Sequence, residues 1–143
     1  MRKSELMILW NIESWFKEPY GVYFVSRRLG TNCLENVGQA FQKLNISCTG
    51  YIEAEVLSLP MWEQLYVQLD ELDQLAQELI QQEIPQEESI VLTLTDIMLD
   101  KSGCYDAFAL GYDVGESPAG HLYVLAPFDE NFTAQQDVIY ETL

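Results

Sequence analysis

A long amphipathic stretch between two prolines constrains the fold more than any other part of this chain. Between Pro60 and Pro85, apolar residues recur at steps of three and four, which is the spacing of one face of an α-helix. That face consists of Trp62, Leu65, Leu69, Leu72, Ala76 and Leu79. Proline suits the first turn of a helix and ends the pattern where it recurs. We therefore expect one helix over residues 60–83, in which 22 residues alone span about 33 Å. Its apolar seam should be buried on a sheet, because the pattern is too short for a coiled-coil dimer.

Several other segments have the composition of β-strands. Residues 20–28 are β-branched and aromatic, and in residues 50–57 the apolar Ile52, Ala54 and Val56 alternate with polar residues, as in a strand with one wet face. Further strand patterns occupy residues 89–99, 106–112 and 121–126, with a last short strand or turn in the tail DVIYETL. The tight turn DKSG separates the first two of these.

Two more segments bear on the helices. Residues 32–45 have a helical spacing of apolar residues behind Asn32, a favourable N-cap. Residues 4–18 fit a helix, although alternation around Trp10 also permits a strand. The whole order predicts an α+β fold in a single domain, residues 1–143, with a mainly antiparallel sheet and two or three helices packed on it.

Charge is distributed very unevenly along the chain. The net charge is −16 over 143 residues. Residues 1–43 hold six bases and four acids, whereas residues 44–143 hold 19 acids and a single base, Lys101. Such a field repels nucleic acid and anionic membranes and attracts basic partners. The alternative is that the acids only keep the protein in solution.

The stretch LGYDVGESPAGHLYVLAPFD, residues 110–129, contains the only histidine. Asp113, Glu116 and His121 could converge on a metal, and Ser117 could act as a nucleophile. However, there is no second histidine and no calcium-loop pattern, and GESPAG does not fit G-x-S-x-G. Its glycines and proline instead favour a long hairpin loop, DVGESPAG, which is either structural or a contact surface for a partner. We expect no metal, no cofactor and no catalytic role for His121.

The cysteines and the hydropathy pattern bear on the compartment. Cys33, Cys48 and Cys104 match no metal-binding spacing and are expected to be buried thiols. No run of 18 apolar residues occurs, and the start of the chain does not resemble a signal peptide. The expectation is a cytoplasmic protein, either a monomer or a homodimer.

An acidic α+β domain with few motifs resembles the small immunity proteins of bacterial toxin–immunity systems. The segment FALGYDVGESPAGHLYVLAPFD is similar to the hairpin-rich C-terminal half of such proteins. This resemblance implies a non-enzymatic protein that binds one toxin, and an acidic inhibitor would suit the basic cleft of a nuclease toxin.

The sequence therefore predicts a non-catalytic acidic protein that neutralises or masks a basic protein partner, without direct contact to nucleic acid or membrane. The acids expected to contact the partner are Asp106, Asp113, Glu116, Asp129 and Glu130, with Glu63 and Asp70 as a second patch on the long helix. Three alternatives stay open. They are a nucleic-acid mimic like the anti-restriction proteins, a small dimeric accessory protein, and a carboxylate-dependent hydrolase.

Overall fold

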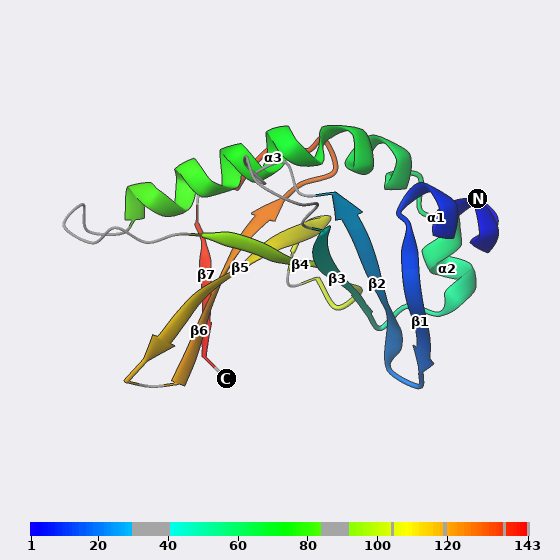
Figure 1. Cartoon of the computed structure of the whole chain (residues 1–143), viewed down its shortest axis with the longest axis horizontal. Helices are drawn as coiled ribbons and strands as arrows, with labels where there is room; N and C mark the ends of the chain where they lie inside the picture. Colours follow the sequence, from blue (N-terminus) through cyan, green and yellow to red (C-terminus); the bar gives the residue numbers. More distant parts are fainter. Residues whose placement is uncertain (30–40, 84–91, 104, 119, 136, 143) are drawn as a thin grey trace.

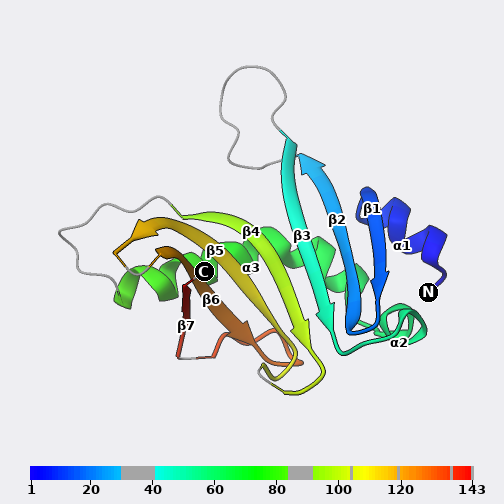
Figure 2. The same ribbon diagram turned by 90° about the horizontal axis from the view of Figure 1, so that it is seen from below.

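The fold is built on one seven-stranded sheet whose strands follow each other in chain order. The structure is a computed structural model that describes residues 1–29, 41–83, 92–103, 105–118, 120–135 and 137–142. The strands are β1 (Ile12–Glu18), β2 (Gly21–Leu29), β3 (Phe41–Thr49), β4 (Thr93–Asp100), β5 (Phe108–Ser117), β6 (Gly120–Phe128) and β7 (Ile139–Thr142). All neighbours pair antiparallel except β3 and β4, which are parallel. The predicted α+β fold with a mainly antiparallel sheet is confirmed (Figure 1, Figure 2).

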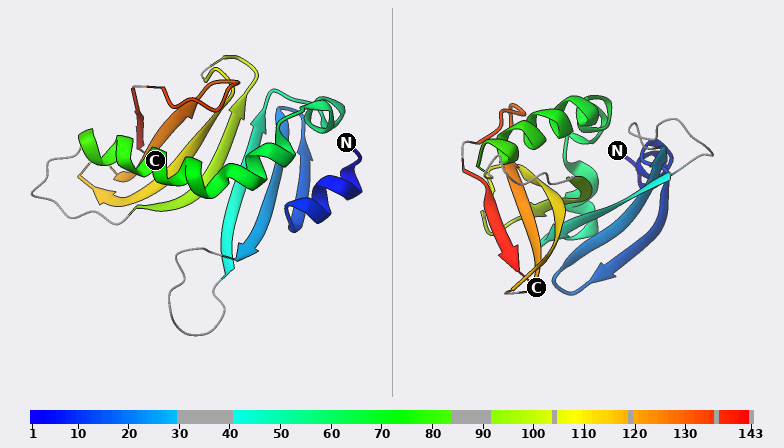
Figure 3. Two further views of the ribbon diagram at one scale, coloured as in Figure 1. Left: turned by 90° about the horizontal axis from the view of Figure 1, so that it is seen from above. Right: turned by 60° about the vertical axis from the view of Figure 1, so that its left-hand side comes forward.

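A helical connection joins the parallel pair. After β3 the chain forms α2 (Glu53–Ser58) and the long helix α3 (Trp62–Glu83) before it enters β4. Parallel neighbours need such a crossover because the chain must return to the same end of the sheet. Figures 1 and 3 show α3 running across the whole sheet, from the β1 side to the β7 side.

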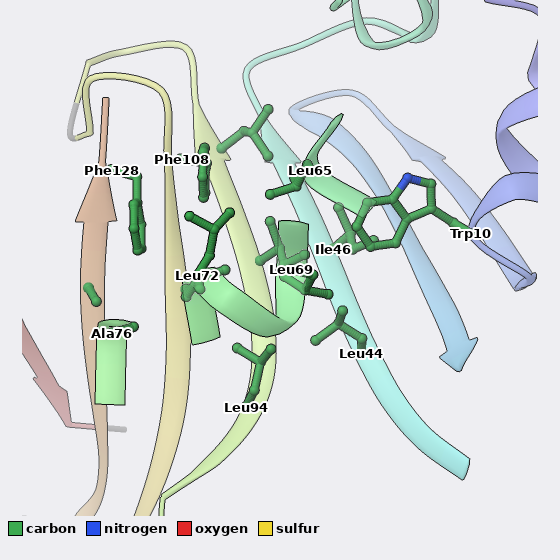
Figure 4. Close-up of a cluster of buried hydrophobic side chains, with 14 of the residues drawn as sticks. Trp10, Leu44, Ile46, Leu65, Leu69, Leu72, Ala76, Leu94, Phe108 and Phe128 are labelled. Atoms are coloured by element: carbon green, nitrogen blue, oxygen red, sulfur yellow. The ribbon is translucent and has the colours of Figure 1, made fainter. Parts of the chain in front are cut away.

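The core lies between α3 and the sheet. The buried residues of α3 are Trp62, Leu65, Leu69, Leu72, Ala76 and Ile80. They face the alternate residues of the strands, such as Ile46 of β3 and Phe108 of β5, in one apolar cluster (Figure 4). The long helix and its buried seam were predicted, with two differences: the helix begins at Trp62 rather than at residue 60, and one seam residue changes. Leu79 is half-buried, and Ile80 takes the expected place in the core.

Two tryptophans anchor the N-terminal helices to this core. Trp10 follows α1 (Lys3–Leu9), is fully buried and donates a hydrogen bond from Nε1 to the backbone oxygen of Trp62 at 3.2 Å. Trp62 is also fully buried and donates from Nε1 to the backbone oxygen of Val56 in α2 at 2.8 Å. The two rings meet edge to face, with centroids 6.1 Å apart. A buried indole needs a partner for its N–H, and these bonds hold α1, α2 and α3 together.

The structure resolves the first ambiguous segment and corrects two expectations nearby. Residues 4–18 contain both elements, α1 and then β1, with a break at Asn11, whose φ is +48°. The helix expected over residues 32–45 lies partly outside the described residues, but residues 41–45 belong to β3. There Leu44 and Ile46 point into the core while Lys43 and Asn45 are exposed, which is the period of a strand.

Residues 50–57 do not form the expected strand, because residues 53–58 form the helix α2. The side chain of Glu55 accepts a hydrogen bond from the backbone N–H of Ile52 at 3.0 Å, which caps the start of this helix. Only Val56 of the three alternating apolar residues is buried, and Ile52 is 64% exposed. The alternating apolar residues of this segment therefore do not form the buried face of a strand.

The eight-residue loop expected at DVGESPAG is also wrong. β5 continues to Ser117 and β6 begins at Gly120, so that the turn between them is short. A bulge between Asp113 and Gly115 absorbs the irregular residues, and the φ of +108° at Gly115 is a conformation that glycine adopts without strain. Most of the expected loop is therefore paired β-structure.

One of the three cysteines, Cys48, lies in the described part of the chain. Cys48 lies in β3 and is fully buried, while Cys33 and Cys104 lie outside the described residues. Among the helices in the described ranges, none is long and apolar enough to span a membrane.

Candidate functional site

The two faces of the sheet differ in what covers them. The three helices lie on one face, and α3 closes over the core (Figure 3). In the part of the chain that the structure describes, no helix lies on the opposite face, which we call the open face. Because side chains alternate along a strand, the residues between the core positions of β3 to β7 point to the open face.

A hollow of about 370 Å³ occupies the open face over β3 to β7. Its lining residues are Asn45, Thr95, Asp96, Met98, Asp113, Tyr123, Leu125 and Glu141. The strand register arranges these residues in two rows. One row runs from Asn45 through Asp96 and Gly111 to Leu125. The other runs from Asp113 through Tyr123 to Glu141. Three carboxylates from three strands therefore meet in one hollow, which we call the acidic hollow.

Asp96 is the most unusual carboxylate of this hollow. It is half-buried in the middle of the sheet, and its Oδ2 accepts a hydrogen bond from the hydroxyl of Thr95 at 2.7 Å. Burial raises the pKa of Asp96 above its ordinary value, and the nearby charge of Asp113 raises it further, while the bond from Thr95 lowers it. A carboxylate with a raised pKa in a hollow is a typical sign of a functional site.

Asp113 forms the neighbouring wall together with the single histidine. Its Oδ1 lies 2.6 Å from Nε2 of His121 and also accepts the backbone N–H of Gly115 at 3.0 Å. The ring of His121 lies beside the ring of Tyr123, with centroids 4.9 Å apart. The bulge at Asp113 thus brings together Asp113 and His121, which the sequence had placed in a possible metal site.

The cations in the described residues are engaged elsewhere. Every lysine and arginine side chain that the structure describes lies within 4.0 Å of a glutamate of α1, β1 or α2. Glu53 holds both Lys3 and Lys17 at 3.4 Å. None of these glutamates lines the acidic hollow, and no described lysine or arginine is paired with Asp96, Asp113 or Glu141. The described lysines and arginines therefore neutralise acids of α1, β1 and α2, whereas the carboxylates of the acidic hollow lie on β4, β5 and β7.

Two other predicted contact residues meet at a second hollow. Asp106 and Glu130 are exposed and line a space of about 300 Å³ where β4 ends and β5 begins. Its other walls are largely apolar and include Met61 and Phe132. Asp106 accepts a hydrogen bond from the side-chain amide of Gln135 at 3.2 Å.

Three of the other predicted acids, Asp129, Glu63 and Asp70, do not line either hollow. Asp129 closes a local turn, because its Oδ1 accepts the backbone N–H groups of Asn131 and Thr133, both at 2.9 Å. Glu63 and Asp70 are exposed on α3. The backbone of Glu116 is paired with that of His121 in the β5–β6 hairpin. The seven predicted residues therefore do not form one patch.

Sequence reasoning missed most of the acidic hollow. Asp96, Tyr123, Asn45 and Glu141 were not singled out, although an aspartate within the apolar strand TLTDIMLD was a usable signal. The full set needs the strand order, because its members are far apart in the chain. Among the described residues, no group of three or more histidines, cysteines or acids has the geometry of a metal site.

Comparison of the chain with protein-family models, with curated proteins and with solved structures finds no match.

Proposed function

We propose that this protein is a non-catalytic binding protein that neutralises or masks a basic protein partner, and that the acidic hollow is the centre of its contact surface. The observation that carries the proposal is the pair Asp96 and Asp113, diagonal neighbours in one hollow. His121 contacts Asp113 there, and no described lysine or arginine pairs with either aspartate. The proposal keeps Asp113 from the sequence-based set and adds Asp96.

The energetics favour a cationic partner. Burying a carboxylate without a counter-charge costs free energy, which the raised pKa of Asp96 expresses. A positive side chain that entered the hollow would remove this cost and gain a charge-assisted hydrogen bond. The excess of acids in the C-terminal hundred residues would in addition steer a basic partner during approach.

The biological setting that fits this chemistry best is an immunity protein that acts in the cytoplasm on a bacterial toxin with a basic surface. The hollow at Asp106 and Glu130 offers a second contact of the same sign with apolar walls. Its apolar walls would add the buried nonpolar area that protein interfaces commonly contain.

A second candidate function follows from the same two carboxylates. A carboxylic acid with a raised pKa beside a second carboxylate is also the arrangement of an acid–base pair in hydrolases. In that case Asp96 would be the proton donor. This candidate predicts turnover of a substrate, whereas the binding proposal predicts only a stoichiometric complex.

The proposal is tested by salt-dependent binding. The immobilised protein captures its partner from a lysate of its native host, and the purified partner is then titrated at several salt concentrations. We expect the association rate to fall steeply as the Debye length shrinks from about 30 Å at 0.01 M to about 8 Å at 0.15 M salt. The double variant Asp96→Asn and Asp113→Asn should weaken binding by at least about tenfold, because removing one partner of a buried charge pair costs about 2 kcal/mol or more.

The matched control is Glu63→Gln with Asp70→Asn, which removes the same charge from the exposed side of α3. If both double variants weaken binding equally, the acids act only through net charge and the acidic hollow is not the contact. If the partner binds as tightly at high salt as at low salt, the proposal is wrong.

A further inference from the structure

The floor of the acidic hollow is shaped by a residue without a side chain. Gly111 lies in β5 between Asp96 of β4 and Leu125 of β6 in the row that crosses the sheet. A Cβ atom at Gly111 would lie 3.0 Å from the Cβ of Asp96 and 3.1 Å from Cδ2 of Leu125. These distances are tighter than ordinary van der Waals contact. The glycine therefore lets the side chains of Asp96 and Leu125 close over the strand, because they occupy the place that a Cβ atom would need.

The two aspartates lie in different rows of the hollow. Asp96 is opposite Gly111, and Asp113 is two residues further along the same strand as Gly111. They are thus diagonal neighbours on one face of the sheet. The Cα atoms of such neighbours are about 7–8 Å apart. A group that donates hydrogen bonds in two directions can bridge carboxylates at this spacing.

The remaining walls supply an aromatic ring and further acceptors. Tyr123 is the direct partner of Asp113 across the β5–β6 pair, and Glu141 is the direct partner of Tyr123. Asn45 adds a side-chain amide beside Asp96. The hollow therefore combines carboxylates with a partly exposed ring and the apolar side chains of Met98 and Leu125.

We infer that the acidic hollow binds the guanidinium group of an arginine presented by the basic protein partner. The planar guanidinium donates in a fork to carboxylates and stacks on aromatic rings, whereas the ammonium of lysine is a compact, strongly hydrated point charge. Apolar walls suit the aliphatic stem of the arginine. A volume of about 370 Å³ is within the range of small ligand pockets. The inference rests on the proposed function and names the chemical group that the partner inserts.

The first experiment uses arginine and lysine in an identical context. The capped tripeptides acetyl-Gly-Arg-Gly-amide and acetyl-Gly-Lys-Gly-amide are titrated into ¹⁵N-labelled protein, and amide chemical shifts are recorded. We expect saturable shifts for the arginine peptide at Asp96, Gly111, Asp113 and Tyr123, with a dissociation constant in the millimolar range. The lysine peptide should bind at least about fivefold more weakly.

Two variants separate the shape of the hollow from its charge. Asp96→Asn keeps the size of the side chain and should weaken arginine binding by at least about fivefold. Glu71→Gln removes the same charge from the exposed side of α3 and should leave arginine binding unchanged. Gly111→Ala changes no charge, but its methyl group would displace the side chains of Asp96 and Leu125, and it should also weaken binding. Because Gly111→Ala could disturb β5, its spectrum is first compared with that of the wild type. If the two spectra differ widely, the conclusion is drawn from Asp96→Asn alone.

The outcomes distinguish this inference from the function on which it rests. Equal binding of both peptides, shifts centred on α3, or full binding by Asp96→Asn would overturn the inference. If binding of the natural partner nevertheless requires Asp96 and Asp113, the proposed function is supported, but the group that enters the hollow is not an arginine. If the partner also binds independently of these residues, both are wrong.

Discussion

Replacing Leu72 by alanine tests whether α3 is bound to the sheet by its apolar seam. Leu72 is 2% exposed and belongs to the cluster that also contains Leu69, Ala76 and Phe108 (Figure 4). Truncation of a buried leucine costs about 2–5 kcal/mol, because the transfer free energy of the lost carbons is joined by the cost of the cavity. Buried neighbours on both adjacent turns of α3 prevent the space from collapsing. We therefore expect a loss of about 3–4 kcal/mol in the free energy of unfolding.

The same helix offers a matched control. Leu75 lies three residues further on and is 48% exposed, so that Leu75→Ala makes the same chemical change with the same gain in helix propensity. It should change the free energy of unfolding by no more than about 0.5 kcal/mol.

Urea titration followed by tryptophan fluorescence measures both variants, because Trp10 and Trp62 are fully buried in the folded protein. A domain of this size is typically stable by about 5–15 kcal/mol, so that Leu72→Ala should still fold. If Leu72→Ala lost less than about 1 kcal/mol, or no more than Leu75→Ala, the seam would not be the anchor of α3.

Two further predictions follow from the perturbed side chains. Because burial raises the pKa of Asp96 in the folded state, the charged form opposes folding, and Asp96→Asn should unfold at a higher urea concentration than the wild type at pH 7. This gain should shrink as the pH falls toward about 4, where aspartate becomes protonated in the unfolded chain as well; a gain that is the same at both pH values would contradict the assignment. Burial also raises the pKa of the Cys48 thiol to about 12. In a variant with Cys33→Ser and Cys104→Ser, Cys48 should therefore react with a thiol reagent at pH 8 only after urea unfolds the protein, and rapid reaction of the folded protein would show that this strand opens readily.

The long helix was predictable because its signal is local and repeated. A strict heptad pattern drifts by about 20° per heptad on a straight helix, and this explains the one error in the seam. Leu65 and Leu72 face the core, but Leu79, two heptads after Leu65, has drifted to the edge of the buried face. Ile80, the next residue, lies within the buried face of the helix and is buried in place of Leu79.

The errors elsewhere arose where tertiary contacts override a short pattern. The alternation of residues 50–57 had no neighbouring strand to pair with, and the cap from Glu55 made a helix of residues 53–58 instead. The glycines and proline of DVGESPAG suggested a loop, but a bulge at Asp113 and Gly115 lets β5 continue through them. Neither a bulge nor a pairing partner leaves a clear mark in a single sequence.

The candidate site was predictable only in part for a similar reason. Asp113 and His121 are close in the chain, and their possible convergence was visible. Asp96 and Glu141 join them through the pairing of β4 with β5 and of β6 with β7. That convergence depends on strand order and register, which the composition of the single strands does not encode.

The single parallel pair in the sheet has a consequence for how the chain reaches this fold. β1 to β3 and β4 to β7 are two meanders whose pairings join strands that follow each other in the chain, whereas the β3–β4 pair must close the whole connection through α2 and α3. Closing a long connection costs entropy before any contact rewards it. The docking of α3 across the junction should therefore set the folding rate. Substitutions in its central turns should slow folding, and those at the outer strands should mainly speed unfolding. The acidic hollow spans the β3–β4 junction, so that it is complete only after this slowest step.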